Sequence, residues 1–220
     1  PVRGRCGGPA LNVPPRRPFR RAATFSGTLG SVLPPSSTAV SLAERVRSRV
    51  AELDEDLRAF RRDIHAHPEL SRTEHRTTAR VAEHLQRAGL EVDPLEGTGL
   101  TCDIRAARNH PAAQMVALRA DLDALPLTET SGLEFASTVR GVAHACGHDL
   151  HTTIVLGAGL VLAELAEHGL LVNDVRLIFQ PAEEVQPGGA LEVMRAGRLR
   201  GVDQIFALHC DPKLDTGQGG

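Results

Sequence analysis

Apolar residues recur every three or four positions from Ser41 onward, with charged residues filling the positions between them. This spacing is that of one face of an amphipathic α-helix, and it is carried by Leu42, Val46, Val50, Leu53, Leu57, Phe60 and Ile64. The pattern predicts a long helix that Pro68 stops, because proline cannot continue a helix. A second helix is predicted over residues 74–88, with Gly89 as its C-cap.

Short apolar runs that are typical of β-strands follow these two helices. They cover residues 101–106, 115–120, 175–179 and 204–208. The stretches between them are helical in pattern near residues 152–168 and 189–196. Strands that alternate with helices predict an α/β fold, in which helices cover both faces of a sheet.

Residues 1–40 differ in character from the rest of the chain. They are rich in Pro, Gly, Ser and Arg, and they hold six arginines without a single acidic residue. We interpret residues 1–40 as a disordered leader and residues 41–220 as one domain. An Arg-rich, acid-free targeting segment is the alternative interpretation of the leader.

Composition narrows the class of protein. The chain has 220 residues, of which 41% are hydrophobic and 24% charged, as in globular domains. A formal net charge of −2 gives no general reason to expect a nucleic-acid or membrane partner. The four widely spaced cysteines do not resemble a disulfide framework, so we expect a reducing compartment and a cytoplasmic location. No apolar run approaches the roughly 18 residues that span a bilayer.

Polar residues cluster at the predicted strand ends, where open α/β sheets collect their ligand chemistry. The clusters are Asp121 with Asp123, then His144, Cys146, His148, Asp149 and His151, then Glu183 with Glu184, and finally His209. Each cluster alone is explained by a polar turn, a helix cap or a packed core residue. Four of them at strand ends favour a metal hydrolase.

The second cluster is the densest, with three histidines, one cysteine and one aspartate within eight residues. A thiolate and imidazoles at this spacing suit a borderline-soft transition metal. The adjacent Glu183 and Glu184 can divide their work, one binding metal and the other moving a proton. A competing interpretation is a thiol nucleophile, with Cys146 activated by a neighbouring histidine.

With these motifs the chain resembles the M20 metallopeptidase family. It is most similar to the amidohydrolase branch, which includes hippurate hydrolases, N-acyl-amino-acid amidohydrolases and plant auxin-conjugate hydrolases. Five motifs in order carry the resemblance: RRDIHAHPEL at 61–70, RADLDALP at 119–126, HACGHDLH at 144–151, QPAEE at 180–184, and Leu208-His209.

The resemblance implies a mixed sheet flanked by helices and two divalent ions, often Mn, Zn, Co or Ni. Carried over motif by motif, it assigns Glu183 as general base and acid, and Asp123 as the residue that orients a ligand. His144 and His151 are candidates for stabilising the oxyanion or supporting the ligands. The implied metal ligands are Cys146, which is favoured as the bridge, His148, Glu184 and His209.

The implied reaction is hydrolysis of the amide bond of small N-acyl amino acids by a metal-activated water. Family members continue into a lid and dimerisation domain and then supply a last histidine ligand. Because this sequence ends at Gly220, we expect a partial catalytic domain over 41–220 that is one ligand short, with a homodimer only where the lid is present. The alternatives are an inactive metal-binding fragment or pseudoenzyme, and a thiol hydrolase that uses Cys146.

Overall fold

The computed structural model describes residues 40–106 and 114–211, so the leader expected over 1–40 lies outside the described residues except for Val40. Helices and strands are interleaved along this part of the chain, as the sequence predicts. Their order is α1 (Leu42–Ala66), α2 (His75–Arg87), β1 (Val92–Pro94), β2 (Leu100–Ile104), β3 (Met115–Asp121), α3 (His148–Glu167), β4 (Asp174–Gln180), α4 (Ala190–Arg195) and β5 (Gln204–Ala207).

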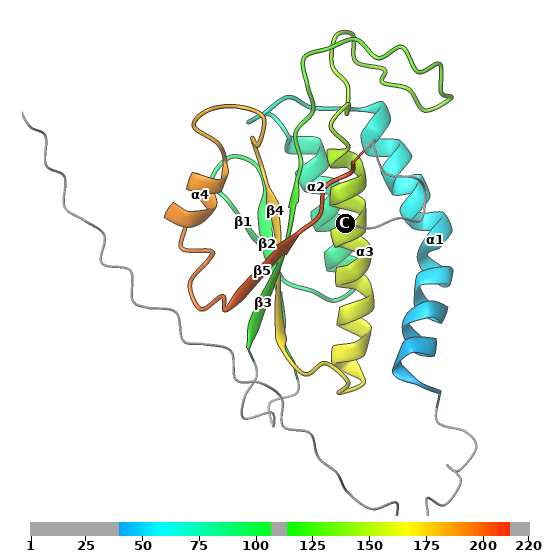
Figure 1. Cartoon of the computed structure of the whole chain (residues 1–220), viewed down its shortest axis with the longest axis vertical. Coiled ribbons are helices and arrows are strands. Elements are labelled where there is room, and N and C mark those ends of the chain that lie inside the picture. Colours follow the sequence, from blue (N-terminus) through cyan, green and yellow to red (C-terminus); the bar gives the residue numbers. More distant parts are fainter. Residues whose placement is uncertain (1–39, 107–113, 212–220) are drawn as a thin grey trace, which may run out of the picture. The chain divides into compact units, whose positions relative to one another are not determined.

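The strands form one sheet in the order β1-β2-β4-β3-β5 (Figure 1). β3 runs parallel to both β4 and β5, whereas β2 runs antiparallel to β1 and β4. The sheet is therefore mixed, as the family resemblance implies. Because β3 and β4 are parallel neighbours, the chain must cross over between them, and α3 forms that crossover.

Helices cover both faces of the sheet, which confirms the α/β prediction. α1, α2 and α3 lie on one face and the short α4 lies on the other (Figure 1). The larger core includes Phe60 of α1 together with Leu177 and Phe179 of β4. Ile178 belongs to the smaller core beneath α4, with Val193. Alternate residues of β4 thus fill opposite cores, as the two-residue period of a strand requires.

Helix α1 begins with a capping box, which the polar sequence at its start makes possible. The Ser41 hydroxyl accepts a hydrogen bond from the Glu44 N–H, and the Glu44 carboxylate accepts one from the Ser41 N–H. The predicted apolar face is buried only from Leu53 onward, since Leu42 and Val50 are each at least half exposed. The helix ends at Ala66, two residues before Pro68.

One strand was not predicted, and one helix begins a turn earlier than predicted. The edge strand β1 has only three residues, mostly exposed, and one of them is proline, so it carries no strand pattern. Helix α3 begins at His148, four residues before the predicted start near Thr152. Gly147 precedes it with a φ of 85°, and the polar residues of its first turn interrupt the apolar pattern. Those polar residues belong to the site described below.

Helix α3 is long and apolar enough by composition to cross a membrane, which differs from the expectation that no stretch is. In the structure, 56% of its apolar stretch is buried. It packs against the sheet on one side and α1 on the other. It also carries buried His148 and Asp149 in its first turn. These features are those of a core helix.

Two glycines allow α3 to lie close to its neighbours. A Cβ atom at position 159 would lie 2.4 Å from Cδ1 of Leu177, which is fully buried in β4. A Cβ atom at position 157 would lie 2.8 Å from Cδ1 of Leu57, a half-buried residue of α1 that has room to move. The approach of α3 to the sheet therefore depends on Gly159 more than on Gly157.

We expect Gly159→Ala to lower the free energy of unfolding by about 1–3 kcal/mol, because the added methyl group overpacks the core. This outcome is opposite to the gain of roughly 1 kcal/mol that alanine brings in an open helix. Gly157→Ala is the matched control and should be close to neutral. Urea unfolding of both variants measures the difference, and a Gly159→Ala protein as stable as wild type would contradict the packing.

Candidate metal centre

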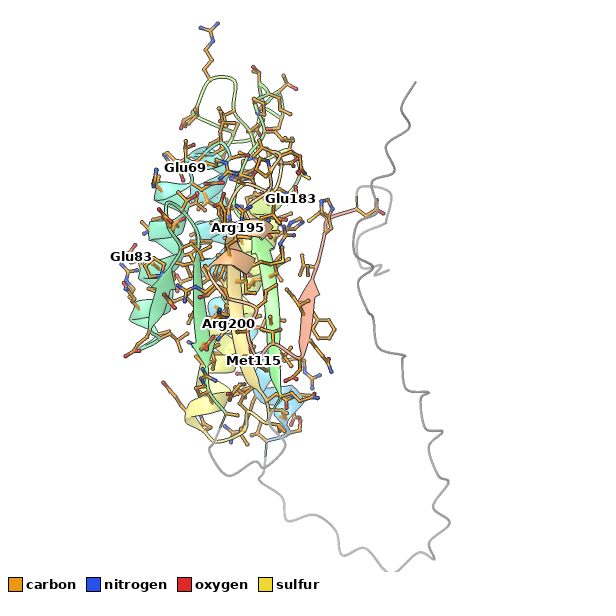
Figure 2. The ribbon with its side chains drawn as sticks, turned by 90° about the vertical axis from the view of Figure 1, so that its left-hand side faces the viewer. Glu69, Glu83, Met115, Glu183, Arg195 and Arg200 are labelled. Carbon is orange, nitrogen blue, oxygen red and sulfur yellow. The ribbon has the colours of Figure 1, made fainter. Side chains whose placement is uncertain are left out.

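The candidate site lies where the parallel strands end. Asp121 of β3 pairs in register with Gln180 of β4, and Arg119 pairs with Ala207 of β5. The polar residues that follow these strands therefore meet at one edge of the sheet, as the carboxyl ends of parallel strands do. Figure 2 shows Glu183 in the upper part of the molecule and Met115, where β3 begins, in the lower part.

His148 is the centre of this site. Its Nε2 atom lies 3.7 Å from a carboxylate oxygen of Glu184 and 4.0 Å from one of Glu183. The same nitrogen lies 3.7 Å from an oxygen of Asp121. The segment that carries Cys146 and His148 and the loop that carries Glu183 and Glu184 are thus brought together around one buried imidazole.

Cys146 and His209 complete the grouping from the other side. The Cys146 Sγ atom lies 3.4 Å from Nε2 of His209, although the two residues are 63 positions apart. Ligand atoms of Cys146, His148 and His209 all lie within 4.8 Å of one another. The same limit holds for His148, Glu183 and Glu184. All four predicted metal ligands and the predicted base therefore converge.

Two buried atoms of the site fit a cation. Among the described residues, His148 Nε2 and Glu184 Oε1 are buried and have no hydrogen-bond partner. His148 Nδ1 lies 2.8 Å from the backbone carbonyl of Asp123, which can only accept, so Nδ1 donates, and in the neutral ring Nε2 presents its lone pair. A buried lone pair facing a buried carboxylate is costly unless a positive charge lies between them. With the nearby thiol and imidazole, these donors suit Zn and similar ions.

Asp123 holds the two glutamates in place. Its carboxylate accepts hydrogen bonds of 3.0 Å from the backbone N–H of Glu183 and from that of Glu184. It also accepts one of 2.6 Å from the hydroxyl of Ser71. Burial alone would raise the pKa of Asp123, but the hydrogen bonds from His148, from Ser71 and from the two N–H groups outweigh it and lower that pKa. Asp123 is therefore a stable anion that fixes the loop.

His144 lies beside His65 of the first motif, and its role near the ions stays a prediction. None of the three groups of potential metal ligands among the described residues includes it. Its ring centroid is 6.3 Å from that of His65, and both of its nitrogens are buried with no partner in the described part of the chain. Burial, as the main cause, lowers its pKa to about 4, so it is neutral near pH 7.

The first motif of the sequence contributes through contacts that its pattern did not reveal. Arg61 Nε and His65 Nδ1 both contact the same oxygen of Asp149, at 2.6 and 2.7 Å. Asp149 follows His148 directly in α3, and it is fully buried. The backbone carbonyl of Glu69 accepts a hydrogen bond from the N–H of Ala124. The motif therefore anchors the loops that carry the site. Its charged residues at helical spacing are the feature of the sequence that could have indicated these contacts.

The described cysteines, Cys102, Cys146 and Cys210, are all free thiols. Burial, and after it the carboxylate of Glu184, raises the pKa of Cys146 to about 12. Such a thiol is poorly activated as a nucleophile unless a cation offsets these effects.

The fold and the converging donors define an α/β protein with a metal-binding centre at the carboxyl edge of its parallel strands. Residues 117–220 match the family described as Peptidase family M20/M25/M40. A Bacillus subtilis structure described as a dinuclear metal binding peptidase from the M20 family is 40% identical, with a TM-score of 0.69 over 74% of this chain and 45% of that chain. Residues 117–220 therefore belong to the M20 family.

Two of three similar curated proteins carry the names of hydrolases, and all three are longer than this chain. Thermostable carboxypeptidase 2 of Saccharolobus solfataricus is 43% identical over 81% of this chain and 45% of its own length. The N-acyl-L-amino acid amidohydrolase of Geobacillus stearothermophilus is 41% identical over 80% and 47%. A Rhodococcus jostii protein named as a glutamate–cysteine ligase is 52% identical over 80% of this chain, but over only 21% of its own length. The chain thus spans less than half of each relative.

We expect Cys146→Ser to weaken the binding of divalent metal at neutral pH. Loss of a residue that only supports a ligand weakens metal affinity about 10–100-fold, so loss of a ligand should cost at least as much. Cys102→Ala is the control, because Cys102 is buried in β2 and belongs to no group of potential ligands among the described residues. Competition titration with a chromophoric chelator measures both affinities. Equal effects of the two substitutions would remove Cys146 from the site.

Proposed function

We propose that the whole protein is a metal-dependent amidohydrolase that cleaves the amide bond of N-acyl amino acids. The observation that carries this proposal is the contrast between two adjacent carboxylates. Glu184 has a buried, unpartnered oxygen 3.7 Å from His148 Nε2, whereas the Glu183 side chain is 41% exposed at the same site. One carboxylate is thus suited to hold a cation and the other to meet a substrate.

In this proposal Cys146, His148, Glu184 and His209 hold the metal ions, of which the family resemblance implies two. Mn, Zn, Co and Ni all suit this mixture of sulfur, nitrogen and oxygen donors. Bound divalent ions supply two things here, polarisation of the scissile carbonyl and a lower pKa for a bound water. Asp123 supports the ligands by accepting hydrogen bonds from the backbone N–H groups of Glu183 and Glu184.

Glu183 acts as the general base and then as the general acid. As a carboxylate it takes one proton from the attacking water and passes it to the nitrogen of the leaving amine. The exposed side chain of Glu183 can reach both the water and the leaving amine, whereas the side chain of its neighbour Glu184 is half-buried. The products are a carboxylic acid and an amino acid.

The substrate class rests on the relatives' names. An N-acyl-L-amino acid amidohydrolase is 41% identical to this chain, and an N-acetylcysteine deacetylase of Bacillus subtilis is 43% identical. The carboxypeptidase name of another relative makes C-terminal residues of peptides the second candidate substrate. Comparing hydrolysis of N-acetyl and N-benzoyl amino acids with that of short peptides separates the two candidates.

The thiol-hydrolase alternative is disfavoured by the surroundings of Cys146. A nucleophilic cysteine needs a lowered pKa, whereas burial and the Glu184 carboxylate raise the pKa of Cys146 to about 12. A protein that binds metal without any amide hydrolysis would instead support the metal-binding pseudoenzyme. Chelator-resistant activity that alkylation abolishes would support the thiol hydrolase.

In the whole protein, Glu183→Gln should retain its metal and lose nearly all turnover, because an amide cannot accept the proton of the water. Glu184→Gln should lose metal together with turnover. Metal content measured by mass spectrometry, alongside hydrolysis of an N-acyl amino acid, separates the two roles. Activity of Glu183→Gln within about tenfold of wild type, which is roughly 1.4 kcal/mol, would contradict its role as the base.

A further inference from the structure

His151 lies in the first turn of α3, fully buried, and both of its ring nitrogens are engaged. Nδ1 lies 2.7 Å from a carboxylate oxygen of Asp121. Nε2 accepts a hydrogen bond of 3.0 Å from the backbone N–H of Cys210. Because a backbone N–H can only donate, Nε2 carries no hydrogen, and the ring hydrogen resides on Nδ1. In this arrangement both ring nitrogens of His151 are therefore occupied by protein groups.

The Asp121 side of this contact is rigid. Asp121 is the last residue of β3, and its second carboxylate oxygen lies 2.8 Å from the guanidinium of Arg119. Its backbone carbonyl accepts a hydrogen bond of 2.7 Å from the hydroxyl of Thr152. The ring of His151 is thus oriented by the sheet and by its own helix.

The Cys210 side of the contact belongs to the segment that carries His209. β5 ends at Ala207, so residues 208–210 leave the sheet without a strand partner. The N–H of Cys210 is the first backbone N–H after His209, and it donates the hydrogen bond to His151. The rings of His151 and His209 lie with centroids 4.8 Å apart.

Gly147 makes this close approach possible. A Cβ atom at position 147 would lie 3.2 Å from Cβ and 3.3 Å from Sγ of Cys210. The residue also has a φ of 85°, a conformation that favours glycine. The loop that carries Cys146 and the segment that carries His209 therefore meet across Gly147 and His151.

We infer that His151 is a positioning residue, which holds His209 at the metal centre by linking the end of β3 to the backbone of Cys210. This inference rests on the proposed metal site. His209 is anchored on one side by β5 and on the other by His151, and its own side chain is exposed. Without the second anchor the His209 segment is free to leave the site.

Two substitutions separate the two bonds of His151. Asparagine places an amide near the position of Nδ1 and retains the bond to Asp121 without reaching Cys210. Glutamine reaches the position of Nε2, where its oxygen accepts the Cys210 N–H. We expect His151→Asn to weaken Co²⁺ binding about 10–100-fold, as the loss of a residue that supports a ligand does. His151→Gln should restore most of that affinity.

His209→Ala tests whether His151 acts through His209. In a His209→Ala protein, adding His151→Asn should cause no further loss of Co²⁺ affinity, because the residue being positioned is already absent. His168→Asn, at the exposed end of the same helix, is the control and should leave the affinity unchanged. Equal losses in both backgrounds, or no loss from His151→Asn, would overturn the inference.

A measurement without metal keeps the inference distinct from the proposed site and from misfolding. The ¹⁵N shifts of the imidazoles in the metal-free wild-type chain should show His151 as a neutral ring with its hydrogen on Nδ1. A ring with its hydrogen on Nε2 would overturn the link to Cys210, even if every variant failed to fold. Absence of Co²⁺ binding by the wild-type chain, with the expected tautomer present, would sink the proposed metal site and leave this link standing.

Discussion

The carboxylate of Asp123 is the contact on which the arrangement of the site depends. It is almost fully buried, and it accepts the N–H groups of Glu183 and Glu184 and the hydroxyl of Ser71. The backbone carbonyl of the same residue orients His148. One residue thus sets the positions of the proposed base and of two proposed ligands. A buried anion with this many donors has little freedom to move, so the loop after β4 is fixed before any ligand binds.

The parallel pairing of β3 with β4 and β5 places Asp123 within hydrogen-bonding distance of the loop that follows β4. Register fixes Asp121 opposite Gln180, so the residues that follow each strand emerge at the same edge. Helix α3 crosses back from that edge and presents His148 and His151 from its first turn. The close approach of α3 to the sheet, which Gly159 permits, therefore belongs to the same construction as the site.

Much of this could be predicted from the sequence, and the reasons for the failures are physical. The alternation of apolar runs gave the strands and long helices, because burial on one or both faces leaves a period that is readable. β1 was not predicted, because three mostly exposed residues are too few to show a repeating apolar pattern. Motif order predicted that Cys146, His148, Glu183, Glu184 and His209 meet. It could not show that His144 packs beside His65, or that both nitrogens of His151 are used, since these follow from distances between segments far apart in the chain.

X-ray absorption at the metal edge of the Zn-loaded protein shows whether Cys146 binds the ion, because it reports the atoms around the ion. We expect one sulfur scatterer at about 2.3 Å, from Cys146, together with nitrogen and oxygen scatterers at about 2.0–2.2 Å. The sulfur scatterer should disappear in Cys146→Ala. Nitrogen and oxygen scatterers alone in the wild-type protein would contradict Cys146 as a metal ligand.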